Sequence, residues 1–499
     1  MDKKAALLDL SFGERIAEEE SGQLSGYFVE TDHWRRIYSG ETDVIYGAKG
    51  AGKSAIYALL MQKQSDLFDR GVLVVGAENP RGTPAFRELV IDPPASELEF
   101  VNLWKLYVLS LLAESLRDYG LASSDAKRVI DELQSAGLLE RDASLAGRVK
   151  AALAHVRRLI RFESVTGELK LDPHSGLPTG LVGKITLREP ASALKSRGFI
   201  SADELLTIAD RALATQGLTA WILFDRLDVA FADEQVLEQN ALRALFKVYL
   251  DFAGLRNIRL KIFLRSDIWH RITEAGFREG SHITRSLTIE WDEPSLLNLI
   301  VRRVVRSTVV CQAYAADPTN VLATIDAQKK LFYRIFPTQV DPGEKRREAL
   351  SWMLSRTADG LNPEVPAPRE LIHLCSESKN QQLQKIATGE NQPEGENLIS
   401  AAAIKDALPE VSRVRFHQTL LAEYPQYTKE LRRLEGEHTQ QTGKTLLKLW
   451  SMSEMEALAK ANTLADIGFF SREGTKESPQ FWVPFLYRSA LQMIQGSAE

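Results

Sequence analysis

Short runs rich in apolar residues alternate with longer amphipathic stretches along the first part of the chain. These runs lie at residues 43–46, 72–75, 220–224 and 258–264, and each is bounded by glycine or polar residues. Runs of this kind are typical of strands that are buried on both faces of a parallel sheet. Because helix-forming stretches separate them, the pattern predicts an α/β fold whose ligands bind at the carboxyl ends of the strands.

A long stretch between the second and third predicted strands has helical periodicity. From about residue 97 to residue 165, Phe100, Trp104, Tyr107 and Leu111 follow one another at the spacing of one helix face. We therefore expect a helical insertion in the sheet domain. The segment 166–188 contains Gly and Pro and ends in the alternating Lys184-Ile185-Thr186-Leu187, which predicts a loop and a hairpin.

The signal for a sheet fades beyond Trp291, where Asp292-Glu293-Pro294 predicts the start of a helix. Helical periodicity then continues to about residue 385, and the polar stretch 388–396 has the composition of a linker. Beyond the linker the pattern predicts helices at 400–408, 416–434, 445–449 and 452–461, then a hairpin of residues 467–470 and 481–483. Helices followed by a terminal hairpin favour a winged-helix-like module.

These patterns divide the chain into three parts. We predict a sheet domain at 1–290 with the insertion at about 97–165, a helical lid at 291–387 and a winged-helix-like C-terminal module at 397–499.

The composition is that of a soluble globular protein, with 44% hydrophobic and 26% charged residues among 499. The 62 basic and 67 acidic side chains give a net charge of −5, so no global basic field attracts nucleic acid or anionic lipid. Cys311 and Cys375 cannot form a disulfide framework or a four-cysteine zinc site. The N-terminus lacks the pattern of a secretory signal, and no apolar stretch approaches about 20 residues. We expect a cytoplasmic protein without membrane contact.

The most specific motif is Gly47-Ala48-Lys49-Gly50-Ala51-Gly52-Lys53-Ser54, which matches a phosphate-binding loop between a predicted strand and a predicted helix. Its glycines allow successive backbone N–H groups to turn toward one anion, at the positive end of the following helix. Lys53 is expected to neutralise the β and γ phosphates of ATP, and Ser54 to bind Mg²⁺. A glycine-rich turn before a lysine is the structural alternative. The motif therefore predicts that residues 1–290 form a P-loop ATPase core.

Two carboxylates follow the buried strand at residues 220–224. Asp225 ends the strand and is the candidate for the Walker B magnesium partner, although a strand-end turn residue would have the same pattern. Asp228 is the candidate for orienting the attacking water or binding Mg²⁺ through water, and a helix N-cap is its alternative. Arg226 occupies the position where many ring ATPases have a catalytic glutamate, which argues against rapid hydrolysis.

Three arginines are candidates for sensing the nucleotide. Arg265 ends the next predicted strand and would lie close to the γ-phosphate if that strand neighbours the Walker strands. Arg369, at the start of a predicted lid helix, is a candidate second sensor, and Arg285 is a candidate finger for a neighbouring subunit. A salt bridge at the rim of the sheet is the alternative for Arg265, and solvated surface charges are the alternative for the other two.

Several segments together resemble a known family. They are the phosphate loop, Phe224-Asp225-Arg226-Leu227-Asp228, Phe263-Leu264-Arg265, Ile289-Glu290-Trp291 before a helix with Arg302 and Arg303, and Pro368-Arg369-Glu370. They resemble bacterial P-loop ATPases of the STAND and KAP type. The resemblance is closer to a stand-alone family that opens with Phe12-Gly13, Ala17-Glu18 and Tyr27-Phe28-Val29.

The resemblance implies an AAA-related ATPase with a helical lid and a winged-helix region. Such relatives often act as nucleotide-dependent switches or assembly platforms, some of them in phage defence. It also implies the roles given above to Lys53, Ser54, Asp225 and Asp228, with Arg265 as first sensor and Arg369 as second. The chain departs from true STAND proteins in its long helical insertion and in lacking an extended repeat or effector domain, so an effector protein would have to act in trans.

The leading hypothesis is therefore an ATP- and Mg²⁺-binding, slowly hydrolysing switch or assembly platform that forms a homo-oligomer. The alternative is a DNA-dependent ATPase or loader, which would hold duplex through basic residues of the C-terminal module. Those residues are Arg413, Arg415, Arg432, Arg433, Lys444, Lys448 and Arg472, and they are interspersed with acidic residues. A third hypothesis is a scaffold with a relict loop.

Overall fold

The computed structural model describes residues 2–13, 28–79, 83–141, 143–165, 183–231, 234–274, 276–390, 392–393, 395–475 and 478–498. Ala17, Glu18, Tyr27 and residues 166–182 of the predicted loop and hairpin segment at 166–188 lie outside them. The chain divides into two compact units. We call residues 32–47 and 53–289 the sheet unit, and residues 1–31, 48–52 and 290–499 the helical unit.

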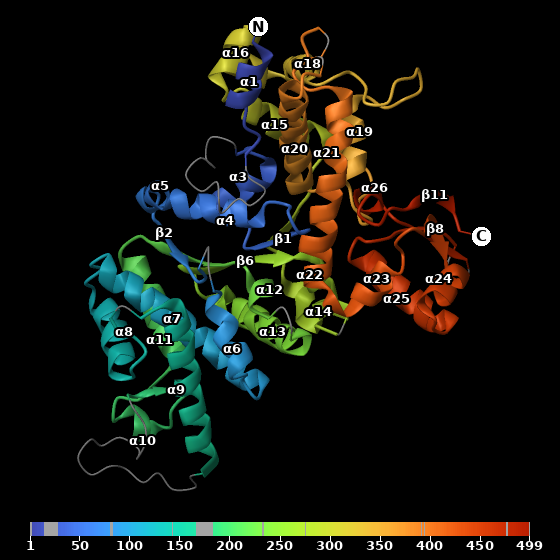
Figure 1. Ribbon diagram of the computed structural model, residues 1–499. Helices are drawn as coiled ribbons and strands as arrows, with labels where there is room; N and C mark the ends of the chain where they lie inside the picture. The colour runs from blue at the N-terminus through green and yellow to red at the C-terminus, as the bar shows by residue number, and fades with distance from the viewer. Residues whose placement is uncertain are drawn as a thin grey trace. The chain divides into compact units, whose positions relative to one another are not determined.

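The sheet unit is built on a five-stranded parallel sheet with the order β2-β5-β6-β1-β7 (Figure 1). Its strands are β1 (Val44–Gly47), β2 (Val72–Gly76), β5 (Thr219–Phe224), β6 (Ile258–Arg265) and β7 (Ser286–Ile289). The predicted parallel α/β sheet and four of its strands are confirmed, because their apolar side chains are buried by helices on both faces. The edge strand β7 was not predicted.

Helices surround this sheet and form the predicted insertion. They are α3 (Asp32–Tyr38), α4 (Lys53–Gln62), α5 (Gln64–Asp69), η1 (Ala85–Arg87), α6 (Glu88–Ile91), α7 (Glu97–Asp118), α8 (Ser124–Ser135), α9 (Leu145–Val165), α10 (Ser192–Lys195), α11 (Ala202–Thr215), α12 (Leu227–Ala230), α13 (Gln235–Asp251), η2 (Phe252–Gly254), α14 (Ser266–Glu274) and η3 (Arg278–His282). The insertion, α7 to α9, forms a single helical group (Figure 1), which confirms the helical prediction. One prediction is wrong: β3 (Ile185–Thr186) pairs in parallel with β4 (Ile200–Ser201) and forms no hairpin, because its partner follows α10.

A buried ion pair lies at the amino-terminal edge of the sheet. The Lys261 ammonium on β6 lies 2.8 Å from Asp43 Oδ1, and both side chains are almost fully buried. Arg285, which precedes β7, lies 2.6 Å from the other oxygen of Asp43. The guanidinium proposed as a finger for a neighbouring subunit is thus paired inside its own chain, at the edge of the sheet opposite to the phosphate loop.

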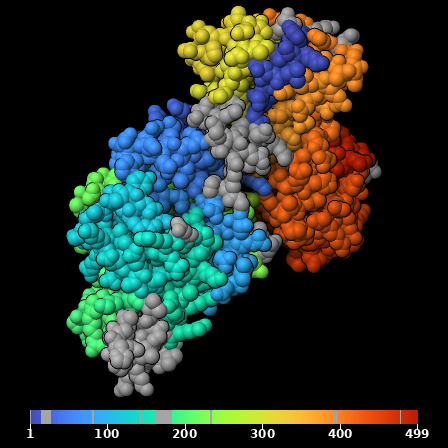
Figure 2. Space-filling view, turned by 60° about the vertical axis from the view of Figure 1, so that its left-hand side comes forward, coloured from blue at the N-terminus to red at the C-terminus, as the bar shows by residue number. Residues whose placement is uncertain are grey.

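The helical unit contains most of the remaining helices. They are α1 (Lys3–Asp9), α15 (Glu293–Val304), α16 (Thr308–Tyr314), α17 (Pro318–Ala323), α18 (Ile325–Ile335), α19 (Ala349–Thr357), α20 (Pro368–Ala387) and α21 (Ala401–Val414). Figure 2 shows the N-terminal α1, in dark blue, against α16, in yellow. Asp9 of α1 accepts a hydrogen bond of 2.6 Å from Ser307. Among the described residues, no helix combines the length and apolar character needed to cross a bilayer.

The end of the chain forms a small mixed unit of helices and strands. Its helices are η4 (Arg415–Leu420, a π-helix), α22 (Leu421–Glu423), η5 (Pro425–Tyr427), α23 (Thr428–Arg432), α24 (Gly443–Trp450), α25 (Glu454–Asp466) and α26 (Phe485–Arg488). Its sheet has the order β11-β8-β10-β9, with β8 (His438–Thr442), β9 (Ser471–Gly474), β10 (Pro479–Trp482) and β11 (Ile494–Ser497).

Two sequence predictions for this region need correction. The predicted helix at 416–434 is broken into short pieces, because a π-helical turn precedes Pro425 and proline cannot continue a helix. The predicted hairpin exists, but its first strand is β9 and not 467–470, since Phe469 and Phe470 are buried in the core before the strand begins.

Candidate active site

The phosphate loop lies between the carboxyl end of β1 and the start of α4. Gly50 and Gly52 have φ values of 82° and 102°, a region in which only glycine is free of strain. The Trp291 indole Nε1 donates a 2.9 Å hydrogen bond to the carbonyl of Ala51. The loop is thus both turned by its glycines and anchored by a tryptophan.

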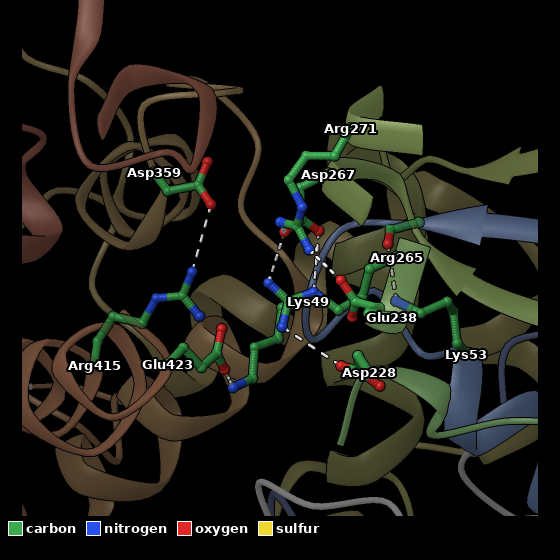
Figure 3. A network of polar contacts seen from close by, with 11 residues as sticks. Lys49, Lys53, Asp228, Glu238, Arg265, Asp267, Arg271, Asp359, Arg415 and Glu423 are labelled. Atoms are coloured by element: carbon green, nitrogen blue, oxygen red, sulfur yellow. Dashed lines mark hydrogen bonds and ion pairs between the residues drawn. The ribbon is translucent and has the colours of Figure 1, made fainter. Parts of the chain in front are cut away.

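Lys53 begins α4 and is half-buried. Its ammonium donates a 2.8 Å hydrogen bond to the carbonyl of Gly47 at the end of β1 (Figure 3). Burial lowers the pKa of Lys53 to about 8, while the nearby Asp228 and Asp225 act in the opposite direction. A negatively charged ligand at the loop would restore the charge that burial disfavours.

Ser54 and Asp225 are brought together although they are far apart in the sequence. The Ser54 hydroxyl donates a hydrogen bond to the Asp225 carboxylate, as does the backbone N–H of Arg226. Asp225 is only 5% exposed, and burial raises its pKa to about 6. A hydroxyl beside a desolvated carboxylate is the oxygen pair that Mg²⁺ takes in phosphate-loop sites.

A parallel sheet, a glycine-rich loop leading into a helix, and a serine paired with a strand-end aspartate are now all in place. The chain has the fold of a P-loop NTPase. No family model and no curated protein matches it.

Two solved structures are similar over most of their length. One is a Walker-type ATPase of Pyrococcus abyssi, at 12% identity and a TM-score of 0.39, covering 93% of this chain and 96% of that one. The other is the ORC2 protein of Aeropyrum pernix, solved as ADPNP and ADP complexes, at 11% identity and a TM-score of 0.37, covering 95% and 93%. At these TM-scores neither structure adds to what the strand order and the loop of this chain show.

Arg265 lies at the same level of the sheet as the phosphate loop. Its strand, β6, lies between β1 and β5, and Arg265 is the register partner of Gly47. Its guanidinium contacts both oxygens of Asp267, at 3.0 and 2.9 Å, and lies 3.5 Å from Asp228 (Figure 3). The condition set by the sequence, that this strand should neighbour the Walker strands, is met.

Sequence reasoning missed the residues that surround Arg265. Arg271 on α14 lies 3.4 Å from Asp267 and 2.8 Å from Glu238 on α13, and burial raises the pKa of Glu238. Asp267 could have been found as an acid two residues after a strand-end arginine. Arg271 and Glu238 lie on separate helices and leave no sequence signal.

The residues next to Asp225 are strained or buried. Arg226 has a φ of 55°, a left-handed conformation that costs a non-glycine residue energy and often marks a functional site. Its guanidinium donates to the carbonyl of Asn79. Glu78 lies two residues beyond the end of β2, the strand that pairs with β5, and burial raises its pKa to about 7. The same strand-end signal that identified Asp225 could have identified Glu78.

Arg369 belongs to the helical unit, so its role as second sensor stays a prediction. It opens α20 beside Gly50, where a Cβ built on the glycine would lie 3.1 Å from the Cβ of Arg369. The Nε of Arg369 is buried and has no hydrogen-bond partner among the described residues. Lys49 in the same loop forms an ion pair with Glu423 of α22 (Figure 3).

The basic residues proposed for DNA binding are partly neutralised. Arg413 pairs with Glu410, Arg472 with Asp466, and Arg415 is buried against Glu370. The helix α25 carries Glu454, Glu456 and Asp466 on exposed positions. Three of the seven basic residues thus have their charge paired within the chain, which lowers what they would contribute to binding a phosphodiester backbone.

Proposed function

We propose that the protein is an ATP-binding, slowly hydrolysing ATPase that acts as a nucleotide-dependent switch or assembly platform. The observation that carries the proposal is the hydrogen bond from Ser54 to the buried Asp225, at the end of the loop that contains Lys53. Ser54 and Asp225 are the residues that would hold Mg²⁺, whose charge would stabilise the phosphates of bound ATP.

The surrounding residues have separate tasks in this proposal. Lys53 binds the terminal phosphates, and Asp228 orients the attacking water. Arg265 stabilises the charge of the transferred phosphate and is held by Asp267. Hydrolysis is slow because Arg226, whose guanidinium is directed to the Asn79 carbonyl, stands where a catalytic glutamate is usual.

Contacts within the helical unit support the switch. Residues 48–52 of the phosphate loop belong to this unit, and Gly50 lies against Arg369 and against the carboxylate of Glu370. Glu370 in turn lies 2.9 Å from the buried Arg415, which opens η4. A change of the loop on nucleotide binding is therefore transmitted to the C-terminal end of the chain through neighbouring residues of α20.

The resemblance to STAND- and KAP-type ATPases adds a partner to the proposal. A switch of this kind would act on an effector protein in trans, in some relatives during phage defence. We expect a switch or assembly platform of this kind to form a homo-oligomer. The DNA-loader alternative has less to support it, because three of its seven basic residues, Arg413, Arg415 and Arg472, are paired with carboxylates.

The test is ATP turnover per subunit over a series of protein concentrations, with Asp228→Asn as the inactive control. Turnover that rises with concentration and disappears in the variant supports an oligomeric ATPase. Flat, near-zero turnover with intact ATP binding supports a resting switch that needs its partner. Turnover that Asp228→Asn leaves unchanged contradicts the assigned role of Asp228.

ATP binding itself is tested by calorimetry on Lys53→Ala, with Lys63→Ala as the matched control. Lys63 follows α4, pairs with Asp66 at 3.7 Å and lies 5.9 Å from the ring centre of Tyr38. Loss of ATP binding in Lys53→Ala, with binding retained in Lys63→Ala, supports the site. Unchanged ATP affinity in Lys53→Ala would contradict the proposal.

A further inference from the structure

A polar pocket lies within the helical unit. It has a volume of about 460 Å³ and is lined by residues of α19, β9, β10, α26 and the loops on both sides of α19. Figure 1 shows α19 and α26, which contact each other. Its cations are Lys345, Arg346, Arg347, Arg356 and Arg488, and its carboxylates are Asp341, Glu364 and Glu473. On a chain with a net charge of −5, this is a local excess of positive charge.

Two of these arginines are stacked on one aromatic ring. The guanidinium carbons of Arg356 and Arg488 lie 3.5 and 3.7 Å from the ring centre of Phe485. Two guanidinium groups cannot share one ring face at such distances, so they lie on opposite faces, no more than about 7 Å apart. A phosphate at the edge of the ring would be within reach of both.

Two of the three pocket carboxylates form their ion pairs with other cations, although Asp341 also attracts Arg356 electrostatically. Asp341 is engaged by Lys405 at 2.6 Å and by the Trp352 indole at 2.8 Å, and Glu364 is engaged by Arg347 at 2.9 Å. In the part of the chain that the structure describes, neither Arg356 nor Arg488 forms an ion pair with a carboxylate. Burial and the neighbouring Arg356 lower the pKa of Arg488 to about 10.

Hydrogen-bond donors are also left over. Arg488 uses Nε for the carbonyl of Val483 and Nη1 for Gln495, at 2.8 and 2.6 Å, which leaves Nη2. The Nε1 of Trp482, another residue of the lining, is buried without an acceptor among the described residues. A buried donor without a partner requires an explanation, and a bound anion supplies one.

We propose that this pocket binds a ligand with a terminal phosphate, held between Arg356 and Arg488. A phosphate monoester carries two negative charges, which match two arginines that form no close ion pair among the described residues, and the planar guanidinium suits phosphate oxygens. The volume of the pocket is in the range of small-molecule sites and is larger than a bare phosphate would fill. Since both faces of Phe485 are covered by guanidinium groups, the ring offers no platform for stacking nucleic-acid bases.

The test uses inorganic phosphate as the probe, in calorimetry on the full-length Lys53→Ala chain, so that the phosphate loop contributes least. We expect one site with a Kd no weaker than about 1 mM. Arg356→Gln and Arg488→Gln, each added to that chain, should weaken binding about 10-fold or more, since each removes a charge-assisted hydrogen bond. Arg413→Gln, an exposed arginine outside the pocket, is the matched control and should leave the affinity unchanged.

Two further measurements decide the class of ligand and guard against misfolding. Arg488→Gln removes the bond to Val483, so Arg356→Gln, which leaves that bond intact, decides the question if Arg488→Gln unfolds in a thermal melt. Dimethyl phosphate, a monoanionic diester, should bind about 10-fold more weakly than phosphate. Equal binding of the diester, or phosphate binding that survives both substitutions, would overturn the proposal, as would the absence of any binding at low salt.

Discussion

Arg265 and Asp267 face each other across the junction of β6 and α14, with both carboxylate oxygens of the aspartate on the guanidinium at 3.0 and 2.9 Å. This bidentate geometry fixes the plane of the guanidinium beside the register partner Gly47 of the phosphate loop. The guanidinium is therefore held in its orientation by a residue of its own chain. Orientation in advance is what a group needs if it is to stabilise charge that develops only during the reaction.

Removing Arg265 should slow hydrolysis more than it weakens binding. We expect Arg265→Ala to lower kcat about 100-fold, because a donor aimed at developing charge acts mainly in the transition state. Asp267→Asn should lower kcat about 10-fold, since it loosens the guanidinium but leaves it in place. Steady-state kinetics check both, and Arg259→Ala, near the other end of β6, is the control. Equal losses in the three variants would contradict a specific role.

The buried Asp225 should make the nucleotide-free protein less stable at neutral pH. Burial raises its pKa from 3.8 to about 6. Above about pH 4 the carboxyl therefore ionises more readily in the unfolded chain than in the folded one, and the free energy of unfolding falls as the pH rises to about 6. Asp225→Asn should therefore raise the free energy of unfolding at pH 7 by about 1–3 kcal/mol, and the gain should shrink as the pH falls toward 4. Thermal and urea unfolding without nucleotide measure it, with the exposed Asp66→Asn as control.

The same variant should behave in the opposite way when ATP and Mg²⁺ are added. The wild type gains stability from Mg–ATP, and this gain should fade below about pH 6, where Asp225 is protonated. Asp225→Asn should gain little at any pH. A variant that is destabilised at pH 7 without nucleotide would show that the carboxylate is structural.

The sequence was sufficient to predict a strand where apolar residues make up most of it. β1, β2, β5 and β6 were predicted because buried parallel strands need apolar runs. β8 was missed because it reads His-Thr-Gln-Gln-Thr, and its buried positions, Thr439 and Gln441, are polar. The phosphate loop was predicted from its sequence motif, and Asp225 from its position directly after a predicted strand. The pairing of Arg265 with Asp267 and of Arg415 with Glu370 depends on tertiary structure, which no local pattern encodes.

The Arg415 guanidinium contacts three polar side chains of the helical unit. It lies 2.9 Å from Glu370 and 3.6 Å from Asp359, and it contacts the Tyr487 hydroxyl at 3.4 Å. We expect Arg415→Met to lower the free energy of unfolding by about 3–5 kcal/mol, because it leaves buried carboxylates without a counter-charge. The double variant Arg415→Met/Glu370→Met should recover part of the loss. Arg413→Met, exposed and two residues away, should change stability by less than about 0.5 kcal/mol.

The two glycines of the phosphate loop offer a matched test of how closely α20 approaches it. Both have positive φ, so alanine strains the backbone at either position by about 1–2 kcal/mol. At Gly50 the new Cβ would also lie 3.1 Å from Arg369 and 3.4 Å from Ala367, whereas at Gly52 no described atom of the helical unit lies within 4 Å. We expect Gly50→Ala to lower the stability of the nucleotide-free protein by about 1 kcal/mol more than Gly52→Ala. Urea unfolding of the pair measures the difference, and equal values would mean that the first turn of α20 does not pack on the loop in solution.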